Sequence, residues 1–317
     1  MQTNVNDPVK PRLFISYRVF GGASRFIPPL FNGDKFLLFK VAFRSFVAAT
    51  DGVDVKLHVL LEADPKYEDF IRANWPRPEL VEFKRISGET EKSSWRMQCD
   101  EARTQEFSDI AGIVEDDYLW LPHSLRELWK LFRYDTNINF ATPFDCVDTY
   151  SGAHKAHRPQ LAFVDQLPFW KTIAWTTSTF FTRRTALVKY RRLFNKYRTY
   201  NKWIYMSDVA LWTTLNHNQI FNPFFFVRMA FINPMDVLKW IDMKMGGRKI
   251  KYGFKYFTAH GWLMAWLLGS RWILFNRKDP IWSPTPGLAH HMNTNETSTG
   301  YNWNSLMSEA IRKESGE

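Results

Sequence analysis

A block of three adjacent carboxylates is the feature of this sequence best suited to chemistry. Glu115, Asp116 and Asp117, which we call the acid block, directly follow the apolar run 110–114. Three like charges side by side repel one another unless a cation or hydrogen bonds offset them. Mg²⁺ and Mn²⁺ bind through carboxylates, often together with the phosphates of a substrate. The acid block therefore suits a metal–diphosphate site, although a solvated acidic turn before a helix would also explain it.

The elements before the acid block predict a parallel sheet. Strands alternate with helices along the first third of the chain. The strands are expected at 12–20, 53–63, 80–86 and 110–115, and the helices at 34–50, 66–75 and 93–107. This alternation is typical of a parallel sheet with helices on both faces. Ligands of such sheets bind beyond the carboxyl ends of the strands.

Polar residues follow three of these predicted strands. Tyr17 and Arg18 lie near the end of the first strand, Asp64 follows the second, and the acid block follows the fourth. Because the carboxyl ends of parallel strands meet at one edge of the sheet, these side chains are expected to line one ligand site. Asp64 and Pro65 would equally form an ordinary turn.

The second half of the chain has a less regular pattern. Strands and a turn into a helix are expected over 138–145 and 170–187, and a basic amphipathic helix over 183–200. Further helices are expected at 207–218, with Ser207 as N-cap, and at 260–275. Pro and Gly predict a loop over 283–294. No linker separates two domains.

The segment "IVEDDYLWLPHSLRELWKLF" resembles the acid motif of glycosyltransferases with the A-type (GT-A) fold. It is especially similar to the Glu-Asp-Asp version of inverting N-acetylglucosaminyltransferases, and the order of elements resembles this fold over residues 12–125. The resemblance implies an α/β fold: one Rossmann-type domain with a mostly parallel central sheet flanked by helices, and a helical, basic C-terminal part. It divides the chain into a flexible N-terminus (1–11), a nucleotide-sugar half (12–125), an acceptor half (126–294) and a C-terminal tail or helix (295–317).

The same resemblance implies roles for the first set of site residues. Asp117 would bind Mn²⁺ or Mg²⁺, which bridges the phosphates of a UDP- or GDP-linked sugar. Asp116 and Glu115 would orient the sugar or ribose and the waters of the metal. Asp64 would contact the base or ribose, and Arg96 would reach the nucleotide. Arg96 would equally be a solvated charge on its helix.

Two later segments complete the resemblance. "YMSDVALW" (205–212) is similar to the segment that supplies the catalytic base, which would be Asp208, although Ser207 stands where many relatives have an acid. An inverting transfer needs one carboxylate to take the proton of the acceptor hydroxyl. In "SPTPGLAHHMNT" (283–294), the adjacent His290 and His291 point in different directions, and His291 is the expected metal ligand. Asp208 would otherwise be a charge at a helix N-terminus, and both histidines ordinary loop residues.

The basic residues of the chain are unevenly spread. The formal net charge is +10, and Gln166 to Ser207 holds nine Lys/Arg without an acid, as Met243 to Lys278 holds eight. Such stretches indicate an anionic partner. One nucleotide-sugar does not require so many cations, so a glycan or lipid-linked acceptor on an anionic surface is expected. Tryptophans beside these cations fit contact with a membrane interface, although core helices with solvated basic faces would give the same pattern. They are Trp203, Trp240, Trp262, Trp266 and Trp272.

The sequence also predicts where the protein resides. The two cysteines, Cys99 and Cys146, have no metal-ligand spacing. The N-terminus lacks the pattern of a signal peptide, and the apolar stretch 262–275 is interrupted and too short to cross a bilayer. We expect a soluble cytoplasmic chain, with peripheral membrane contact left open.

The sequence leaves two other functional classes open. A basic, aromatic-rich module for nucleic acid or membranes would explain the charge and the 14 Trp, but not the acid block. It would also require a nucleic-acid motif that the sequence lacks, so no nucleic-acid partner is expected. A sugar nucleotidyltransferase usually has an early Gly-rich phosphate loop. Segment 19–29 contains Gly21, Gly22 and Arg25, but not the spacing of a phosphate loop.

Overall fold

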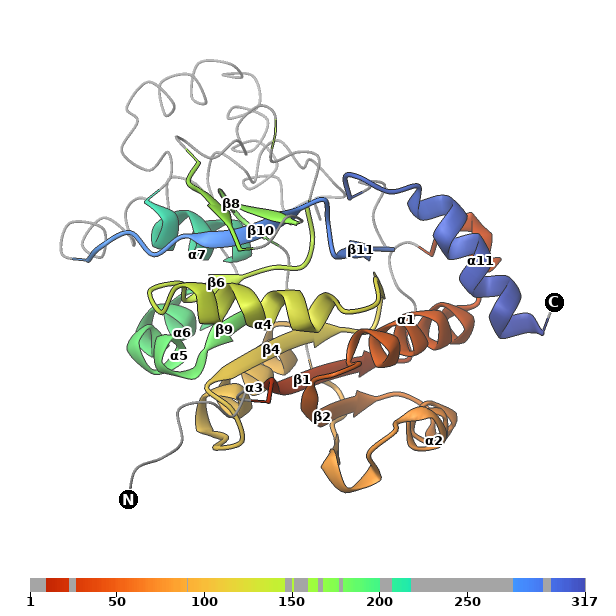
Figure 1. Cartoon of the computed structure of the whole chain (residues 1–317). Coiled ribbons are helices and arrows are strands. Elements are labelled where there is room, and N and C mark those ends of the chain that lie inside the picture. Colours follow the sequence, from red (N-terminus) through yellow and green to blue (C-terminus); the bar gives the residue numbers. More distant parts are fainter. Residues whose placement is uncertain are drawn as a thin grey trace, which may run out of the picture.

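One central sheet with helices on both faces organises the chain in the computed structural model (Figure 1). The structure describes residues 10–22, 27–89, 91–145, 150, 159–164, 168–176, 179–199, 207–217, 276–292 and 298–316.

The first four strands form the parallel half of this sheet, as the sequence predicts. They are β1 (Arg12–Phe20), β2 (Asp54–Glu62), β3 (Val81–Arg85) and β4 (Ile110–Glu115), in the spatial order β3-β2-β1-β4. β1 pairs in parallel with β2 and β4, so that Arg18 lies opposite Leu60 on one side and Glu115 on the other. These four strands end together at what we call the carboxyl edge.

The other five strands extend the sheet beyond β4. In spatial order they are β9 (Phe180–Arg183), β6 (Phe140–Ala141), β10 (Ile281–Thr285), β8 (Phe169–Ile173) and β7 (Leu161–Phe163). β9 is antiparallel to β4 and β6, and β8 is antiparallel to β10 and β7, whereas β10 is parallel to β6. Only β9 and β8 therefore run against the other strands of this sheet, which is mostly parallel.

Two hydrophobic layers enclose the sheet. Leu13, Ile15 and Val19 of β1 pack toward α1 (Lys35–Ala49) and α4 (Ser124–Tyr134), while Phe14 packs toward α3 (Glu91–Thr104). Successive strand side chains point to opposite faces, and both faces of β1 are buried, as expected in a parallel sheet. The remaining helices are α2 (Pro65–Asn74), α5 (Arg184–Lys189), α6 (Arg191–Thr199), α7 (Ser207–Asn216) and α11 (Trp303–Ser315), with short 3₁₀ turns at Pro29–Phe31 and Pro78–Leu80.

Helix α1 begins at the carboxyl edge, after the loop that leaves β1. Asp34 caps it, because its side chain accepts a hydrogen bond from the backbone N–H of Leu37 at 3.0 Å. The helix ends before Gly52, which has a φ of 72° that suits a residue without Cβ. α11 packs against α1 and buries Trp303 and Met307 there.

Two predictions for the second half are wrong. The predicted loop 283–294 contains part of β10 and the short strand β11 (Ala289–His291), which pairs antiparallel with β5 (Tyr118–Trp120). Such a short strand exists because of its partner, which the local pattern of Pro and Gly cannot reveal. The predicted helix 183–200 is divided into α5 and α6 at Tyr190, whose buried hydroxyl donates to Asp279 at 2.5 Å.

Several predicted features lie outside the described residues. They are the apolar helix 260–275, Cys146, the N-terminal segment 1–9 and Trp203, Trp240, Trp262, Trp266 and Trp272. Within the ranges given above, no helix combines the length and the apolar character that crossing a bilayer requires.

Candidate functional site

The acid block lies where β4 leaves the sheet. Glu115 is the last residue of β4, and Asp116 and Asp117 form the turn into β5. β11 pairs with β5 so that His291 lies opposite Tyr118, and the N–H of Met292 donates to the carbonyl of Asp117 at 2.9 Å. A two-stranded pairing therefore brings a histidine 174 residues away in the chain to the acid block.

Glu115, Asp117 and His291 form what we call the ligand group. One ligand atom of each lies within 4.8 Å of those of the other two. The Nε2 of His291 is 3.2 Å from Oδ2 of Asp117, and its ring stacks on Tyr118 with 4.7 Å between centroids. Burial disfavours the protonated imidazole, but the charge and hydrogen bond of Asp117, together with the charge of Glu115, outweigh burial and raise the pKa of His291.

The ligand group fits a divalent metal ion by its chemistry. Two carboxylates and one imidazole supply oxygen and nitrogen atoms at the short separations that one ion needs. Mg²⁺ is usually held by oxygen atoms and waters, so the imidazole makes these residues better suited to Mn²⁺ than to Mg²⁺. Asp117 and His291, the two predicted metal ligands, are thus side by side, and Glu115 joins them.

Asp116 does not contact the same partners as Glu115 and Asp117 do. Its Oδ1 is 2.9 Å from the Nζ of Lys35, the first residue of α1, and its Oδ2 accepts from the N–H of Phe20 at 3.0 Å. Both members of the pair are at least nine-tenths buried. Burial disfavours the charged ammonium, but Asp116 and Asp117 outweigh this effect and raise the pKa of Lys35. Burial also raises the pKa of Asp116, but the hydrogen bonds that it accepts from Lys35 and from the N–H of Phe20 favour the carboxylate, so we take Asp116 and Lys35 as an ionised pair.

Lys35 is a residue that the sequence reasoning missed, although the sequence carries a signal. The N-terminal turn of a helix carries a partial positive charge, so a lysine at its first position is electrostatically unfavourable. An acidic partner nearby would offset this effect. The acid block supplies one, but the distance in sequence hides it.

Of the predicted nucleotide-binding residues, Arg18 lies at the ligand group. Its guanidinium Nη1 is 3.8 Å from Oε1 of Glu115 across the β1–β4 pairing. Tyr17, in contrast, is fully buried beside Phe43 and Phe46 of α1. Burial, followed by the charges of the acid block, raises its pKa.

The remaining predicted residues are not members of the ligand group, and the side chain of one of them is not described. Asp64 is exposed at the start of α2, where its side chain makes no capping hydrogen bond. Arg96 is half exposed on α3, with its Nε 3.9 Å from the carboxylate of Asp100. Asp208 belongs to the first turn of α7, but its side chain lies outside the described part of the structure.

A second polar cluster, which the sequence analysis missed, surrounds Asp145 after β6. Asp145 is fully buried, and its carboxylate lies 2.9 Å from the Nζ of Lys171 on β8. It accepts hydrogen bonds from Tyr150 at 2.7 Å, from Thr285 at 3.2 Å and from Thr299. Thr285 and Thr299 stand on either side of β11 in the chain. The cluster therefore anchors the segment that carries His291 to the end of β6.

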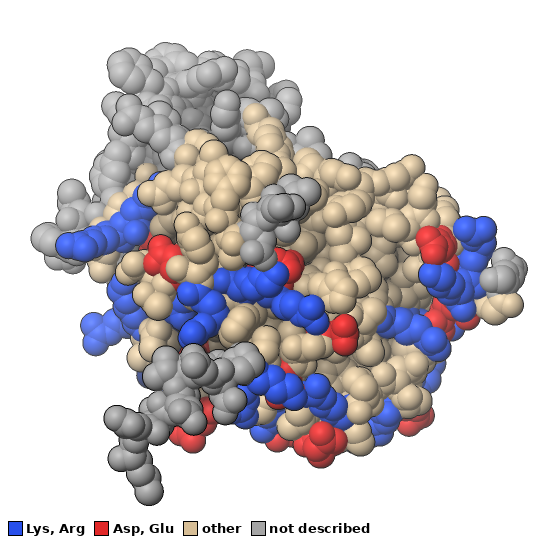
Figure 2. Space-filling model, viewed as in Figure 1, with Lys and Arg blue, Asp and Glu red and all other residues tan. Residues whose placement is uncertain are grey.

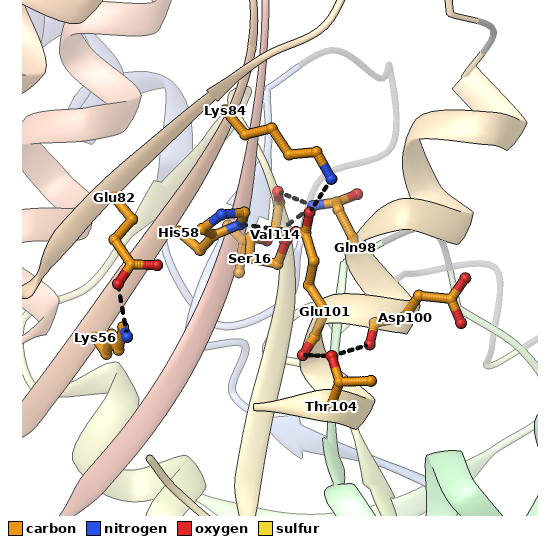
Figure 3. Close-up of polar contacts among 10 residues, drawn as sticks. All are labelled: Ser16, Lys56, His58, Glu82, Lys84, Gln98, Asp100, Glu101, Thr104 and Val114. Carbon is orange, nitrogen blue, oxygen red and sulfur yellow. Dashed lines mark hydrogen bonds and ion pairs between the residues drawn. The ribbon is translucent and has the colours of Figure 1, made fainter. Parts of the chain in front are cut away.

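A third network holds α3 against the parallel strands (Figure 3). Glu101 accepts hydrogen bonds from Ser16 at 3.1 Å and Lys84 at 3.1 Å, and lies 2.8 Å from Nδ1 of His58. Gln98 donates to the carbonyls of Ser16 and Val114 at 2.8 and 3.1 Å. In a nucleophilic triad the histidine stands between serine and carboxylate, whereas here the carboxylate is central. The network thus supports β4 just before Glu115 rather than forming a second reactive centre.

Some of the basic residues of the first acid-free stretch have internal partners. Lys171 pairs with Asp145, Arg184 donates to the carbonyl of Gln105 at 3.2 Å, and Arg183 donates to the carbonyl of Ile138 at 2.9 Å. On the face drawn in Figure 2, Lys and Arg side chains are interspersed with Asp and Glu across the lower part of the molecule. Some of the excess Lys and Arg residues of the sequence therefore stabilise the fold through internal contacts.

Comparisons with known proteins give likenesses of structure alone. No protein-family model matches this chain, and no curated protein does. A structure of an active-site mutant of LgtC matches with 11% identity and a TM-score of 0.43, over 96% of this chain and 95% of the other. The galactosyltransferase LgtC with donor and acceptor sugar analogs matches with 12% identity and a TM-score of 0.38, over 62% and 68%. CMP:2-keto-3-deoxy-manno-octonic acid synthetase with CTP matches with 16% identity and a TM-score of 0.36, over 60% and 83%.

Proposed function

We propose that this protein is a metal-dependent glycosyltransferase that moves a sugar from a nucleotide-sugar to a carbohydrate or glycolipid acceptor. The observation that carries the proposal is the ligand group at the end of β4, where Glu115, Asp117 and His291 place their ligand atoms within 4.8 Å of one another. Sites at the carboxyl ends of parallel strands are where ligands of such sheets bind. The expected donor is a UDP- or GDP-linked sugar.

In this proposal the residues of the acid block have two different roles. Glu115 and Asp117, together with His291, would hold Mn²⁺, whereas Asp116 pairs with Lys35 and accepts a hydrogen bond from the N–H of Phe20. When bound, the ion would stabilise the negative charge of the leaving diphosphate. The hydrogen bonds of Asp116 fix the turn between β4 and β5, and this turn orients its two neighbours.

Asp208 is the proposed general base of an inverting transfer. Its backbone lies in the first turn of α7, which follows β9 in the chain and falls in the predicted acceptor half. A base on a different element from the metal ligands could remove the acceptor proton while the diphosphate leaves on the other side of the sugar. The role of Asp208 is testable independently of metal binding.

Titration calorimetry with Mn²⁺ and each of UDP and GDP tests the proposal. Diphosphate binding should require Mn²⁺ in the wild-type protein and should be lost in Asp117→Ala. Asp100→Ala removes a half-buried carboxylate of α3 that pairs with Arg103, and should behave as the wild type does. Equal diphosphate affinity with and without Mn²⁺, in wild type and Asp117→Ala alike, would overturn the proposal.

Incubation with nucleotide-sugars then separates the transferase from the alternative enzyme. A glycosyltransferase should release a nucleoside diphosphate from one nucleotide-sugar in the presence of Mn²⁺. A sugar nucleotidyltransferase would instead release pyrophosphate from a nucleoside triphosphate and a sugar phosphate. Release of pyrophosphate without any release of nucleoside diphosphate would replace our proposal by this alternative.

A further inference from the structure

Lys35 is a buried cation placed beside three acids. Its ammonium is 2.9 Å from Asp116, and its side chain is 9% exposed. Burying an ion pair removes both charges from water, which apolar residues of similar size would not require. Its position at the start of α1 is also unfavourable for a cation. A lysine here is therefore not what stability alone would favour.

Lys35 lies next to the ligand group as well as to Asp116. Its ammonium is 2.9 Å from Asp116, and the two chain neighbours of Asp116, Glu115 and Asp117, both belong to the ligand group. The ammonium is therefore a near neighbour of the proposed metal site. A fixed positive charge this close repels a metal ion and attracts an anion.

The charges of the site indicate which ligand Arg18 and Lys35 favour. Arg18 lies 3.8 Å from Glu115, and Lys35 lies 2.9 Å from Asp116, so each of these two acids has a cation nearby. Such cations are not needed to bind a divalent metal, which the carboxylates attract by themselves. They become favourable when a polyanion arrives with the metal.

We propose that Lys35 is a binding residue for the anionic donor, which strengthens binding of the metal–diphosphate and weakens binding of the metal ion alone. This inference rests on the proposed function. It assigns to Lys35 two effects of opposite sign, whereas a lysine that only held the turn in place would have effects of one sign. This difference makes the role measurable.

The test compares Lys35→Met with the wild type by titration calorimetry. We expect Lys35→Met to bind Mn²⁺ alone as tightly as the wild type or more tightly. We expect the same variant to bind UDP or GDP in the presence of saturating Mn²⁺ about tenfold more weakly, the effect of one nearby charge in a partly screened site. Lys35→Arg should restore much of the diphosphate affinity because it restores the charge.

Two further variants keep the result interpretable. Lys56→Met removes a lysine that pairs with Glu82 at 2.8 Å between β2 and β3, and should leave both affinities unchanged. If Lys35→Met does not fold, Lys35→Gln removes the positive charge but keeps a side chain that can donate a hydrogen bond to Asp116. It should still bind Mn²⁺ through the ligand group and should bind the diphosphate about tenfold more weakly than the wild type.

The outcomes separate this inference from the proposed function. Wild-type protein that binds neither Mn²⁺ nor Mn²⁺-dependent diphosphate would remove the proposed function. Wild-type protein that binds both, with a Lys35→Met variant that loses both affinities equally, would show that Lys35 only supports the turn. Diphosphate affinity unchanged in Lys35→Met, or in Lys35→Gln, would likewise overturn the role assigned to Lys35.

Discussion

His290 should make the stability of the metal-free protein depend on pH. It is 2% exposed, its ring stacks on Trp303 of α11 at 5.3 Å, and its Nδ1 accepts from the N–H of Ser298 at 3.4 Å. Burial, followed by the charge of His291, lowers the pKa of His290 from 6.5 to about 4. Below about pH 6.5 the unfolded chain therefore takes up a proton that the folded protein excludes, and the free energy of unfolding falls as pH decreases toward 4.

The size of this effect follows from the two pKa values. At about 1.36 kcal/mol for each pKa unit, the interval from 6.5 to about 4 is worth about 3 kcal/mol. The assay is urea unfolding, with EDTA, of the wild type and of His290→Phe at pH 7.5 and 4.5. Phenylalanine keeps the stacking on Trp303 but leaves the N–H of Ser298 without its acceptor, which should cost about 1 kcal/mol at pH 7.5.

The decisive quantity is the loss of stability between the two pH values. His290→Phe has no imidazole to protonate, so its loss should be smaller than that of the wild type by about 2–3 kcal/mol. Acidic groups elsewhere change the free energy of unfolding of both proteins in the same way, so their contributions cancel in this comparison. An equal loss in the two proteins would refute the reasoning, because it would mean that His290 takes up its proton in the folded state as readily as in the unfolded chain.

Three further predictions concern single side chains. His291→Asp should lower the ratio of Mn²⁺ to Mg²⁺ affinity, measured by calorimetry, because it replaces an imidazole by an oxygen ligand; an unchanged ratio would exclude His291 as a ligand. Asp208→Asn should leave donor binding within a few-fold and reduce turnover by about 10²–10⁴. Near-normal turnover, or a product that NMR shows to retain the donor configuration, would remove Asp208 from this role. Asp145→Leu should reduce the free energy of unfolding by about 3–5 kcal/mol, because it leaves the ammonium of Lys171 buried without its carboxylate; a change below about 1 kcal/mol in urea unfolding would contradict this.

The parallel half of the fold could be predicted because its signals are local. β1 and β4 have the predicted bounds, and α1 differs from the predicted 34–50 by one residue at each end, since Asp34 is its cap and not its first residue. Apolar periodicity, a capping aspartate and a terminating Gly52 are all contained in the segment itself. The acid block was placed correctly at the carboxyl edge for the same reason.

What the sequence could not provide are the pairings between distant segments. β5 and β11 have three residues each, too few for a period to be read, and each is a strand because the other lies beside it. Asp145 was overlooked because a single acid after a short apolar run is common, and only the fold brings Lys171 to it. The break at Tyr190 depends likewise on Asp279, which is 89 residues away.

The same long-range pairings explain how the ligand group is held. Asp117 is fixed from the β11 side by the N–H of Met292, and the turn that contains it is fixed from the α1 side by the hydrogen bonds of Asp116. The Asp145 cluster anchors both flanks of β11, so the imidazole of His291 is positioned by contacts far from the acids. Three segments that are remote in sequence thus converge on one turn. Because each is tied down by separate hydrogen bonds, disturbing β11 should displace His291 and leave Glu115, held within β4, in place.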